Sequence, residues 1–198
     1  MSNDMVKFGG IGAIFCMLSA IAGIVAVAML WLSPIDYAFA GTHIDFGTSI
    51  GYAVGVALLS IGSFGLWKQY KTPLNQNVGI FGILVVIAGI ITGVILWRNG
   101  GVVSGVSLMF SGASPIDIMG IAGIVWLEIN GLFFVLFGYS LYKIKEKTGV
   151  EKLARGAGFL TIVAGIIFMA MVPYGYLGGQ APILLSTILT AYVLFKAR

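Results

Sequence analysis

Charged residues are scarce in this chain of 198 residues: Asp, Glu, Lys and Arg make up 9% of it, whereas 59% is hydrophobic. A soluble globular domain carries about 25% charged residues. So few charged side chains could not cover a water-facing surface, so most of the surface must face lipid or other membrane protein. The scarcity therefore excludes a soluble domain and predicts a multi-pass protein of the cell membrane.

Cysteine and histidine each occur once, as Cys16 and His43. A single cysteine excludes an intrachain disulfide and a structural zinc cluster. A single histidine excludes a haem held by two histidines of this chain. We therefore predict neither a bound metal nor a cofactor.

Motifs that carry chemistry are absent as well. The sequence contains no G-x-x-x-x-G-K-[ST], no H-E-x-x-H and no G-x-S-x-G. These absences weigh against an enzyme but leave the question open. The net charge of +4 follows the membrane topology described below, so nucleic acid is not expected as a partner.

Long apolar runs are what the sequence does contain. A helix needs about 20 apolar residues, rising 1.5 Å each, to cross about 30 Å of hydrocarbon. Six runs approach that length, and the last is the shortest. The predicted fold is all-α, a single domain forming a polytopic bundle of six transmembrane helices over 8–32, 48–67, 78–97, 117–142, 156–175 and 181–195.

The basic residues are distributed unevenly around these runs. With the N-terminus in the cytoplasm, ten of the eleven Lys and Arg residues fall on the cytoplasmic side, and only Arg98 falls outside. An excess of Lys and Arg in cytoplasmic loops is the usual signal of orientation. The sequence therefore predicts that both termini are cytoplasmic, with longer outer loops over 33–47 and 98–116.

Small residues recur at helical spacing within the runs. The second run contains a tandem G-x-x-x-G, and the third repeats the spacing once. Lipid is as apolar as the helices, so membrane helices associate through close packing, which small residues permit. The glycines that we predict to pack the bundle are Gly47, Gly51, Gly55, Gly89, Gly93 and Gly131.

Two polar residues interrupt the fourth run, where Glu128 and Asn130 stand in VWLEING. At 100° per residue their side chains point about 200° apart. Neither side chain should face lipid. We therefore predict that this helix is either central in its bundle or covered on one face by another chain.

No cation lies within a run to pair with Glu128. An acid at the bilayer centre costs about 2.5–3.5 kcal/mol on insertion scales, and such residues can mark ion paths. Without a cation, hydrocarbon favours the neutral acid, which could donate to a carbonyl or to Ser60, Ser63 or Thr92. We prefer this structural role over the alternative, a proton or cation site.

The other candidates lie in the predicted outer segments. His43 and Asp45 occur together in THIDF, and a histidine with carboxylates can bind a metal. A single loop without a second histidine makes a solvated surface the preferred interpretation. Asp36 and Asp117 stand in two SPID sequences, and they could meet at the outer face.

Three functions remain open from the sequence. The preferred one is an integral membrane subunit without catalytic chemistry, which packs against other chains in a larger membrane complex, for example an energy-converting one. The first alternative is a small homo-oligomeric transporter or channel with Glu128 and Asn130 in its path. The second is a membrane enzyme that acts on lipid through the outer aspartates. The expected partners are membrane lipids and either other subunits or further copies of the chain.

Overall fold

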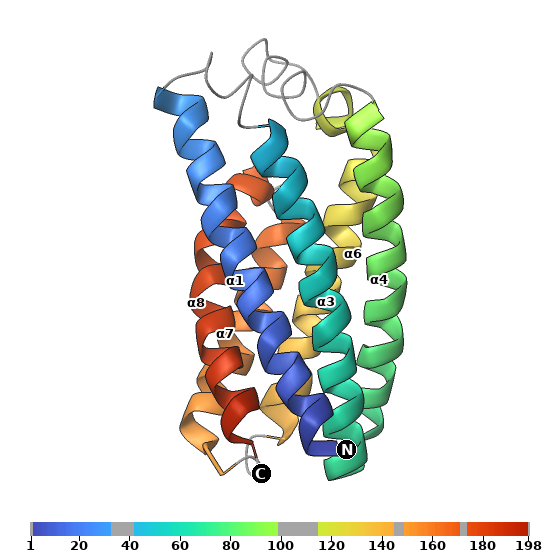
Figure 1. The fold of residues 1–198 in the computed structure, drawn as a ribbon, viewed down its shortest axis with the longest axis vertical. Coiled ribbons are helices and arrows are strands. Elements are labelled where there is room, and N and C mark those ends of the chain that lie inside the picture. The colour runs from blue at the N-terminus through green and yellow to red at the C-terminus, as the bar shows by residue number, and fades with distance from the viewer. Residues whose placement is uncertain (1, 33–41, 99–114, 145–148, 171–173, 198) are drawn as a thin grey trace.

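The computed structural model describes residues 2–32, 42–98, 115–144, 149–170 and 174–197 (Figure 1). All the regular secondary structure in these residues is helical, which confirms the all-α prediction. Four of the described helices contain a stretch long and apolar enough to cross a membrane. The helices are α1 (Ser2–Leu32), α3 (Thr42–Tyr70), α4 (Pro73–Arg98), α6 (Pro115–Ile144), α7 (Glu151–Ala170) and α8 (Tyr174–Lys196).

All six described helices begin before the corresponding predicted runs. α3 begins at Thr42, inside the segment predicted as an outer loop over 33–47. α7 begins at Glu151 and α8 at Tyr174, so the predicted run 156–175 contains the connection between two helices. The helices extend into polar sequence beyond the apolar runs. α7, for example, begins with Glu151 in its first turn, where an acidic residue stabilises a helix.

The six described helices form a closed ring in the order of the sequence. Each packs against the next, and α8 returns to pack against α1. Both chain termini lie at the same end of the bundle (Figure 1). The shortest described connection is the turn between α3 and α4, where Lys71 adopts a positive φ of 54° and its amide donates to the carbonyl of Trp67.

Glycines bring α1 and α3 into backbone contact. A Cβ atom on Gly12 would lie 2.6 Å from the carbonyl oxygen of Gly55, and one on Gly9 would lie 2.8 Å from the Cα of Gly62. Real Cβ atoms essentially never come so close to other atoms. The closest approach of these two helices therefore depends on the absence of side chains at four positions.

A second contact of this kind joins α6 to α7. A Cβ on Gly131 would lie 2.8 Å from the carbonyl oxygen of Gly165, and one on Gly138 would lie 2.6 Å from that of Gly158. Of the other glycines expected to pack the bundle, Gly51 faces Ser19. Gly89 is half-buried, and the surroundings of Gly93 lie outside the described part of the structure.

Gly47 does not belong to the packing surface on which the sequence analysis placed it. It is exposed, and a Cβ there would meet nothing within 4 Å. Residues spaced by four advance 400° around a helix, so each step moves 40° away from the previous residue. Gly47 therefore lies about 80° from Gly55 and outside the contact with α1.

Aromatic side chains of α6 fill the interior of the ring. Phe133 stacks on Phe137 at 5.9 Å between ring centroids and meets Phe134 edge-on at 5.7 Å. Phe134 lies 6.4 Å from Phe168 of α7. All four rings are at most 1% exposed, so this cluster joins two helices inside the bundle.

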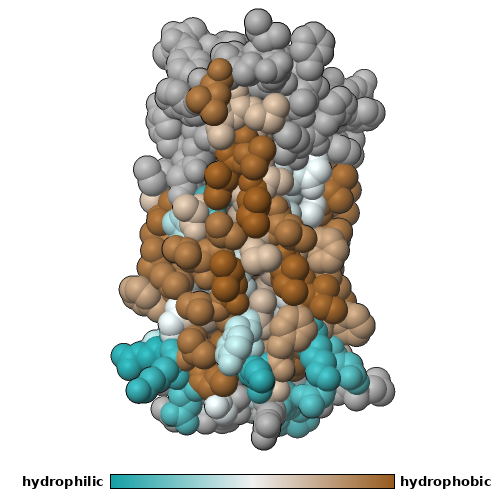
Figure 2. Space-filling model, turned by 60° about the vertical axis from the view of Figure 1, so that its left-hand side comes forward, coloured by the Kyte–Doolittle hydropathy of each residue, from teal (hydrophilic) through white to brown (hydrophobic). Residues whose placement is uncertain are grey.

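Apolar and charged residues occupy different parts of the outer surface. An apolar band covers the middle of the face shown in Figure 2, and hydrophilic residues gather below it, at the end that carries the termini. Large aliphatic side chains are exposed on the band, among them Leu18 at 54% and Leu84 at 57%. This pattern fits a membrane-embedded protein. Among the described residues, the exposed basic side chains of the charged end are those of Lys7, Lys68, Lys71, Lys143, Lys152, Arg155 and Lys196.

Candidate functional site

Glu128 lies on the outside of the ring. It is exposed, and it stands 16 residues before the last residue of α6, a rise of about 24 Å along the helix. Leu132, one turn further along the same face, is 40% exposed. The single described chain therefore presents a carboxyl group near the middle of an apolar helix face.

Asn130 lies on the opposite side of α6, as expected from the 200° between the two residues. It is 1% exposed and lies on the buried face that also carries Phe133, Phe134 and Phe137. Neither its amide nitrogen nor its amide oxygen has a hydrogen-bond partner among the described residues. Glu128 and Asn130 therefore cannot line one path within a single chain.

Two of the three hydroxyl groups expected to accept a hydrogen bond from Glu128, those of Ser60 and Ser63, do not do so. Ser60 and Ser63 are buried inside the ring, at 1% and 0% exposure, whereas Glu128 is outside it. The Ser60 hydroxyl donates to the carbonyl of Val56 at 2.7 Å. The side chain of Thr92 lies outside the described part. Among the described residues, no hydrogen bond of Glu128 is found.

A polar contact that the sequence analysis missed crosses the interior from α3 to α8. The Tyr52 hydroxyl donates to Oε1 of Gln180 at 2.5 Å, and both residues are almost fully buried. Gly23 of α1 makes room for this amide, because a Cβ there would lie 2.9 Å from its Cδ. The contact joins α1, α3 and α8. The only signal in the sequence was the position of Tyr52 within an apolar run.

The outer candidates are only partly placed. Asp36 lies outside the described residues, and so do the side chains of His43, Asp45 and Asp117. The backbone of His43 and Asp45 belongs to the first turns of α3, which corrects the flexible loop assumed for them. Asp117 stands in the first turn of α6. No group of three or more metal-ligating side chains occurs in the described part of the chain.

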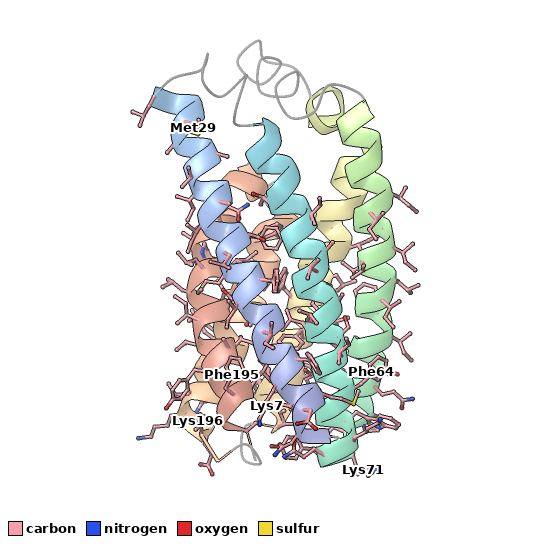
Figure 3. All side chains as sticks on the ribbon, viewed as in Figure 1. Lys7, Met29, Phe64, Lys71, Phe195 and Lys196 are labelled. Atoms are coloured by element: carbon pink, nitrogen blue, oxygen red, sulfur yellow. The ribbon has the colours of Figure 1, made fainter. Side chains whose placement is uncertain are left out.

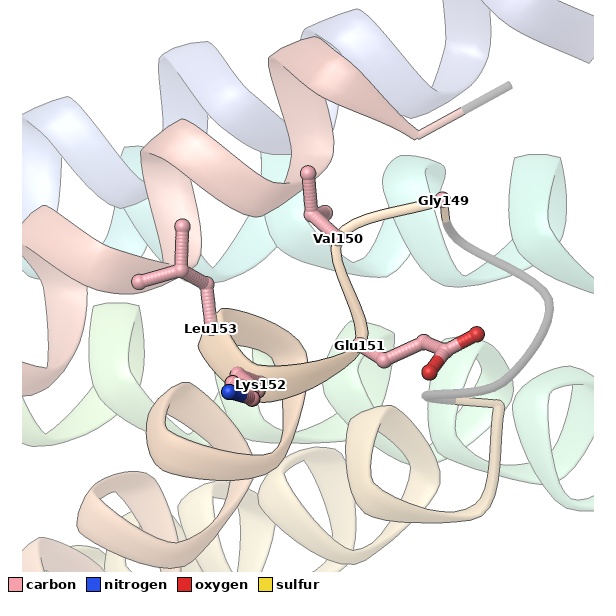
Figure 4. Close-up of a pocket in the computed structure, with 5 residues that line it drawn as sticks. All are labelled: Gly149, Val150, Glu151, Lys152 and Leu153. Atoms are coloured by element: carbon pink, nitrogen blue, oxygen red, sulfur yellow. The ribbon is translucent and has the colours of Figure 1, made fainter.

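A shallow depression lies at the charged end, where the chain enters α7. It is lined by Gly149, Val150, Glu151, Lys152 and Leu153 (Figure 4). Gly149 has a φ of 73°, a left-handed conformation that glycine adopts without steric strain. The depression is open, and its one carboxylate and one amine do not converge on a common point (Figure 4). We therefore assign it no binding role.

The side chain of Asn130 has no hydrogen-bond partner among the described residues, and this leads to a prediction about stability. An unpaired buried polar group costs about 1–3 kcal/mol, and leucine has nearly the same size. Asn130→Leu is therefore expected to raise the free energy of unfolding in detergent by about 1 kcal/mol. Gln180→Leu is the matched control, and it should lower that energy because it removes the acceptor of Tyr52. Equal losses in both variants would show that Asn130 is hydrogen-bonded.

No protein-family model, curated protein or solved structure matches this chain. The function must therefore be argued from its own residues. Two of them stand out: a carboxyl group exposed on an apolar surface, and an amide buried without a partner. The carboxyl group of Glu128 bears on the contacts that the outer face of the ring makes, and the amide of Asn130 bears on the interior of the ring.

Proposed function

We propose that this protein is an integral membrane subunit without catalytic chemistry of its own, and that another membrane chain covers the face of α6 that carries Glu128. The exposure of Glu128 in the middle of α6 carries this proposal. Ionisable residues within the membrane almost always face a bundle interior, a water-filled cavity or a pairing group. In the single chain, Glu128 faces none of these.

The free-energy argument favours a covered face. A carboxyl group in hydrocarbon costs about 2.5–3.5 kcal/mol on insertion scales, and neither Ser60 nor Ser63 can offset this cost from inside the ring. A neighbouring helix that accepts a hydrogen bond from the neutral acid, or pairs a cation with its ionised form, would offset it. The neighbour has to come from another chain, because α6 already packs against α4 and α7 on its two sides.

The proposal includes the topology. We propose that all six helices cross the cell membrane with both termini in the cytoplasm. α6 has 30 residues and α8 has 23, which correspond to about 45 and 34 Å of helix and exceed the hydrocarbon thickness of about 30 Å. The gathering of exposed Lys and Arg at the end that carries the termini supports the orientation (Figure 2).

A transporter or channel is the second candidate, and one observation favours it. Both amide atoms of Asn130 are buried without a partner, and such groups occur where a protein binds water or a ligand. The exposed position of Glu128 counts against a shared path in one chain. The third candidate, a lipid-acting enzyme at the outer face, rests on the sequence positions of Asp36 and Asp117 alone.

The test compares two exposed positions at similar depth. A photo-crosslinking amino acid replaces Leu132, on the face of Glu128, or Leu18 of α1. The ring order places α1 three helices from α6 in either direction. Leu18 lies 16 residues from the start of α1, about 24 Å along the helix, which is the distance of Glu128 from the end of α6; Leu132 is one turn closer to that end, at about 18 Å. Membranes are irradiated, and the adducts are identified by mass spectrometry.

The expected result is one protein adduct of defined mass at position 132 and only lipid adducts at position 18. An adduct with a second copy of this chain would identify a homo-oligomer, and a foreign subunit would identify a hetero-complex. Only lipid adducts at both positions would contradict the proposal. In that case Glu128 faces lipid, and the measurement to make next is flux through the interior that contains Asn130.

A further inference from the structure

The charged end of the bundle contains two cation–aromatic pairs on neighbouring helices. On α6, the Nζ atom of Lys143 lies 5.3 Å from the ring centroid of Tyr139. On α7, the guanidinium carbon of Arg155 lies 5.9 Å from the ring centroid of Tyr142, which belongs to α6. The second pair bridges the two helices.

The backbones of α6 and α7 are in contact beside these cation–aromatic pairs. A Cβ on Gly158 would lie 2.9 Å from the backbone nitrogen of Tyr142, so the helices touch directly beside the Arg155 pair. Both cations are exposed. Among the described residues neither has an ion-pair partner, although Glu151 stands one turn before Arg155. The two positive charges therefore lie at the same end of the contact between α6 and α7, each against a tyrosine ring and accessible to an anion.

Apolar side chains continue from these cations into the membrane band. Phe159, one turn after Arg155 on α7, is 60% exposed, and Ile166 further along is 48% exposed. Phe159 lies about 6 Å and Ile166 about 16 Å along the helix from Arg155. These distances match the depth of one leaflet, which is about 15 Å of hydrocarbon.

We propose that Lys143 and Arg155 bind the phosphate of an anionic phospholipid, with the acyl chains lying on Phe159 and the apolar residues beyond it. We call these two cations with Tyr139, Tyr142 and Phe159 the α6–α7 lipid site. Arginine presents paired donors that match a phosphate, and basic pockets between membrane helices bind anionic headgroups. The site does not depend on a protein partner at Glu128.

The test uses native mass spectrometry of the delipidated protein in detergent, titrated with phosphatidylglycerol or with phosphatidylcholine of the same acyl chains. The site variant is Lys143→Gln with Arg155→Gln. The matched control is Lys7→Gln with Lys196→Gln, which removes two exposed charges at the same end from another pair of touching helices, α1 and α8 (Figure 3).

We expect the unaltered protein to retain one phosphatidylglycerol in preference to phosphatidylcholine. The site variant should bind it about 30-fold more weakly, as expected for two basic residues, and the control should bind it as the unaltered protein does. Arg155→Lys should bind with intermediate affinity, and Phe159→Ala should weaken both lipids alike. Thermal unfolding of each variant shows that the bundle is intact.

Three outcomes would overturn the proposal. Equal weakening in the site variant and the control would mean a diffuse basic collar rather than a site. Equal retention of both lipids by the unaltered protein would mean that the headgroup charge is not recognised. Displacement of the lipid by millimolar inorganic phosphate would mean that the acyl chains contribute nothing, and that the cations bind free phosphate.

Discussion

Gly12→Leu is expected to prevent α1 from docking on α3 and so to destroy the ring. A Cβ at this position would lie 2.6 Å from the carbonyl oxygen of Gly55 and 2.7 Å from the backbone nitrogen of Leu59. Backbone atoms cannot rotate away as side chains do, so the helices would have to separate along their contact. Overpacking usually costs about 1–3 kcal/mol, and we expect at least the upper end here. Unfolding in a denaturing detergent, followed by tryptophan fluorescence, measures it.

Gly47→Leu is the matched control on α3. It makes the same chemical change in the same pair of helices, but the glycine is exposed and has open space around it. Surface substitutions usually change stability by less than about 0.5 kcal/mol. If Gly12→Leu unfolded at the same detergent concentration as Gly47→Leu, the backbone contact between α1 and α3 would be wrong.

Glu128→Leu is expected to separate this chain from its partner while leaving the chain itself folded. The substitution removes a carboxyl group from an apolar face, so insertion of the free chain becomes easier. It also removes the hydrogen bond or ion pair that the proposed partner supplies. Polar contacts between membrane helices contribute about 0.6–2 kcal/mol, so the affinity for the partner should fall roughly 3- to 30-fold. Co-purification in a mild detergent, with quantified subunits, measures it.

Two further variants separate the possible explanations. Glu128→Gln keeps a neutral hydrogen-bonding group and should preserve the assembly if the acid is protonated. Leu18→Ala changes an exposed side chain at the same depth on α1 and should have no effect. Unchanged assembly in Glu128→Leu would contradict the proposed function. Loss of assembly in Glu128→Gln as well as in Glu128→Leu would indicate an ionised carboxylate that pairs with a cation of the partner chain.

The helical class of this protein could be predicted because a bilayer leaves few choices. Backbone groups in hydrocarbon must bond within their own segment, so long apolar runs become helices. The opposite directions of Glu128 and Asn130 followed from the helical rotation alone. The same rotation explains the misplaced Gly47, because a spacing of four drifts around the helix. Gly55 and Gly62, seven residues apart, differ by only about 20° and stay in the contact.

The interior of the ring could not be predicted from local patterns. Tyr52 and Gln180 are 128 residues apart in the chain, and no periodicity connects them. Their contact depends on α8 returning to α1, which hydrophobic runs do not specify. Arg155 stands just before the predicted run 156–175, whereas in the structure it belongs to the second turn of α7. Recognising its pairing with Tyr142 requires knowledge of how α6 and α7 pack.

The packing of α8 against α1 means that the ring closes only after the last helix has been synthesised. Along the chain from α3 to α7, each helix meets its predecessor as soon as it is made, but the second neighbour of α1 is the last helix of the ring. Until α8 arrives, the Tyr52 hydroxyl lacks its acceptor, and Gly10 and Gly23 lack Phe195 and Gln180. A nascent chain that stops before α8 therefore leaves polar groups open to lipid. We expect cellular quality control to recognise and degrade such a truncated chain.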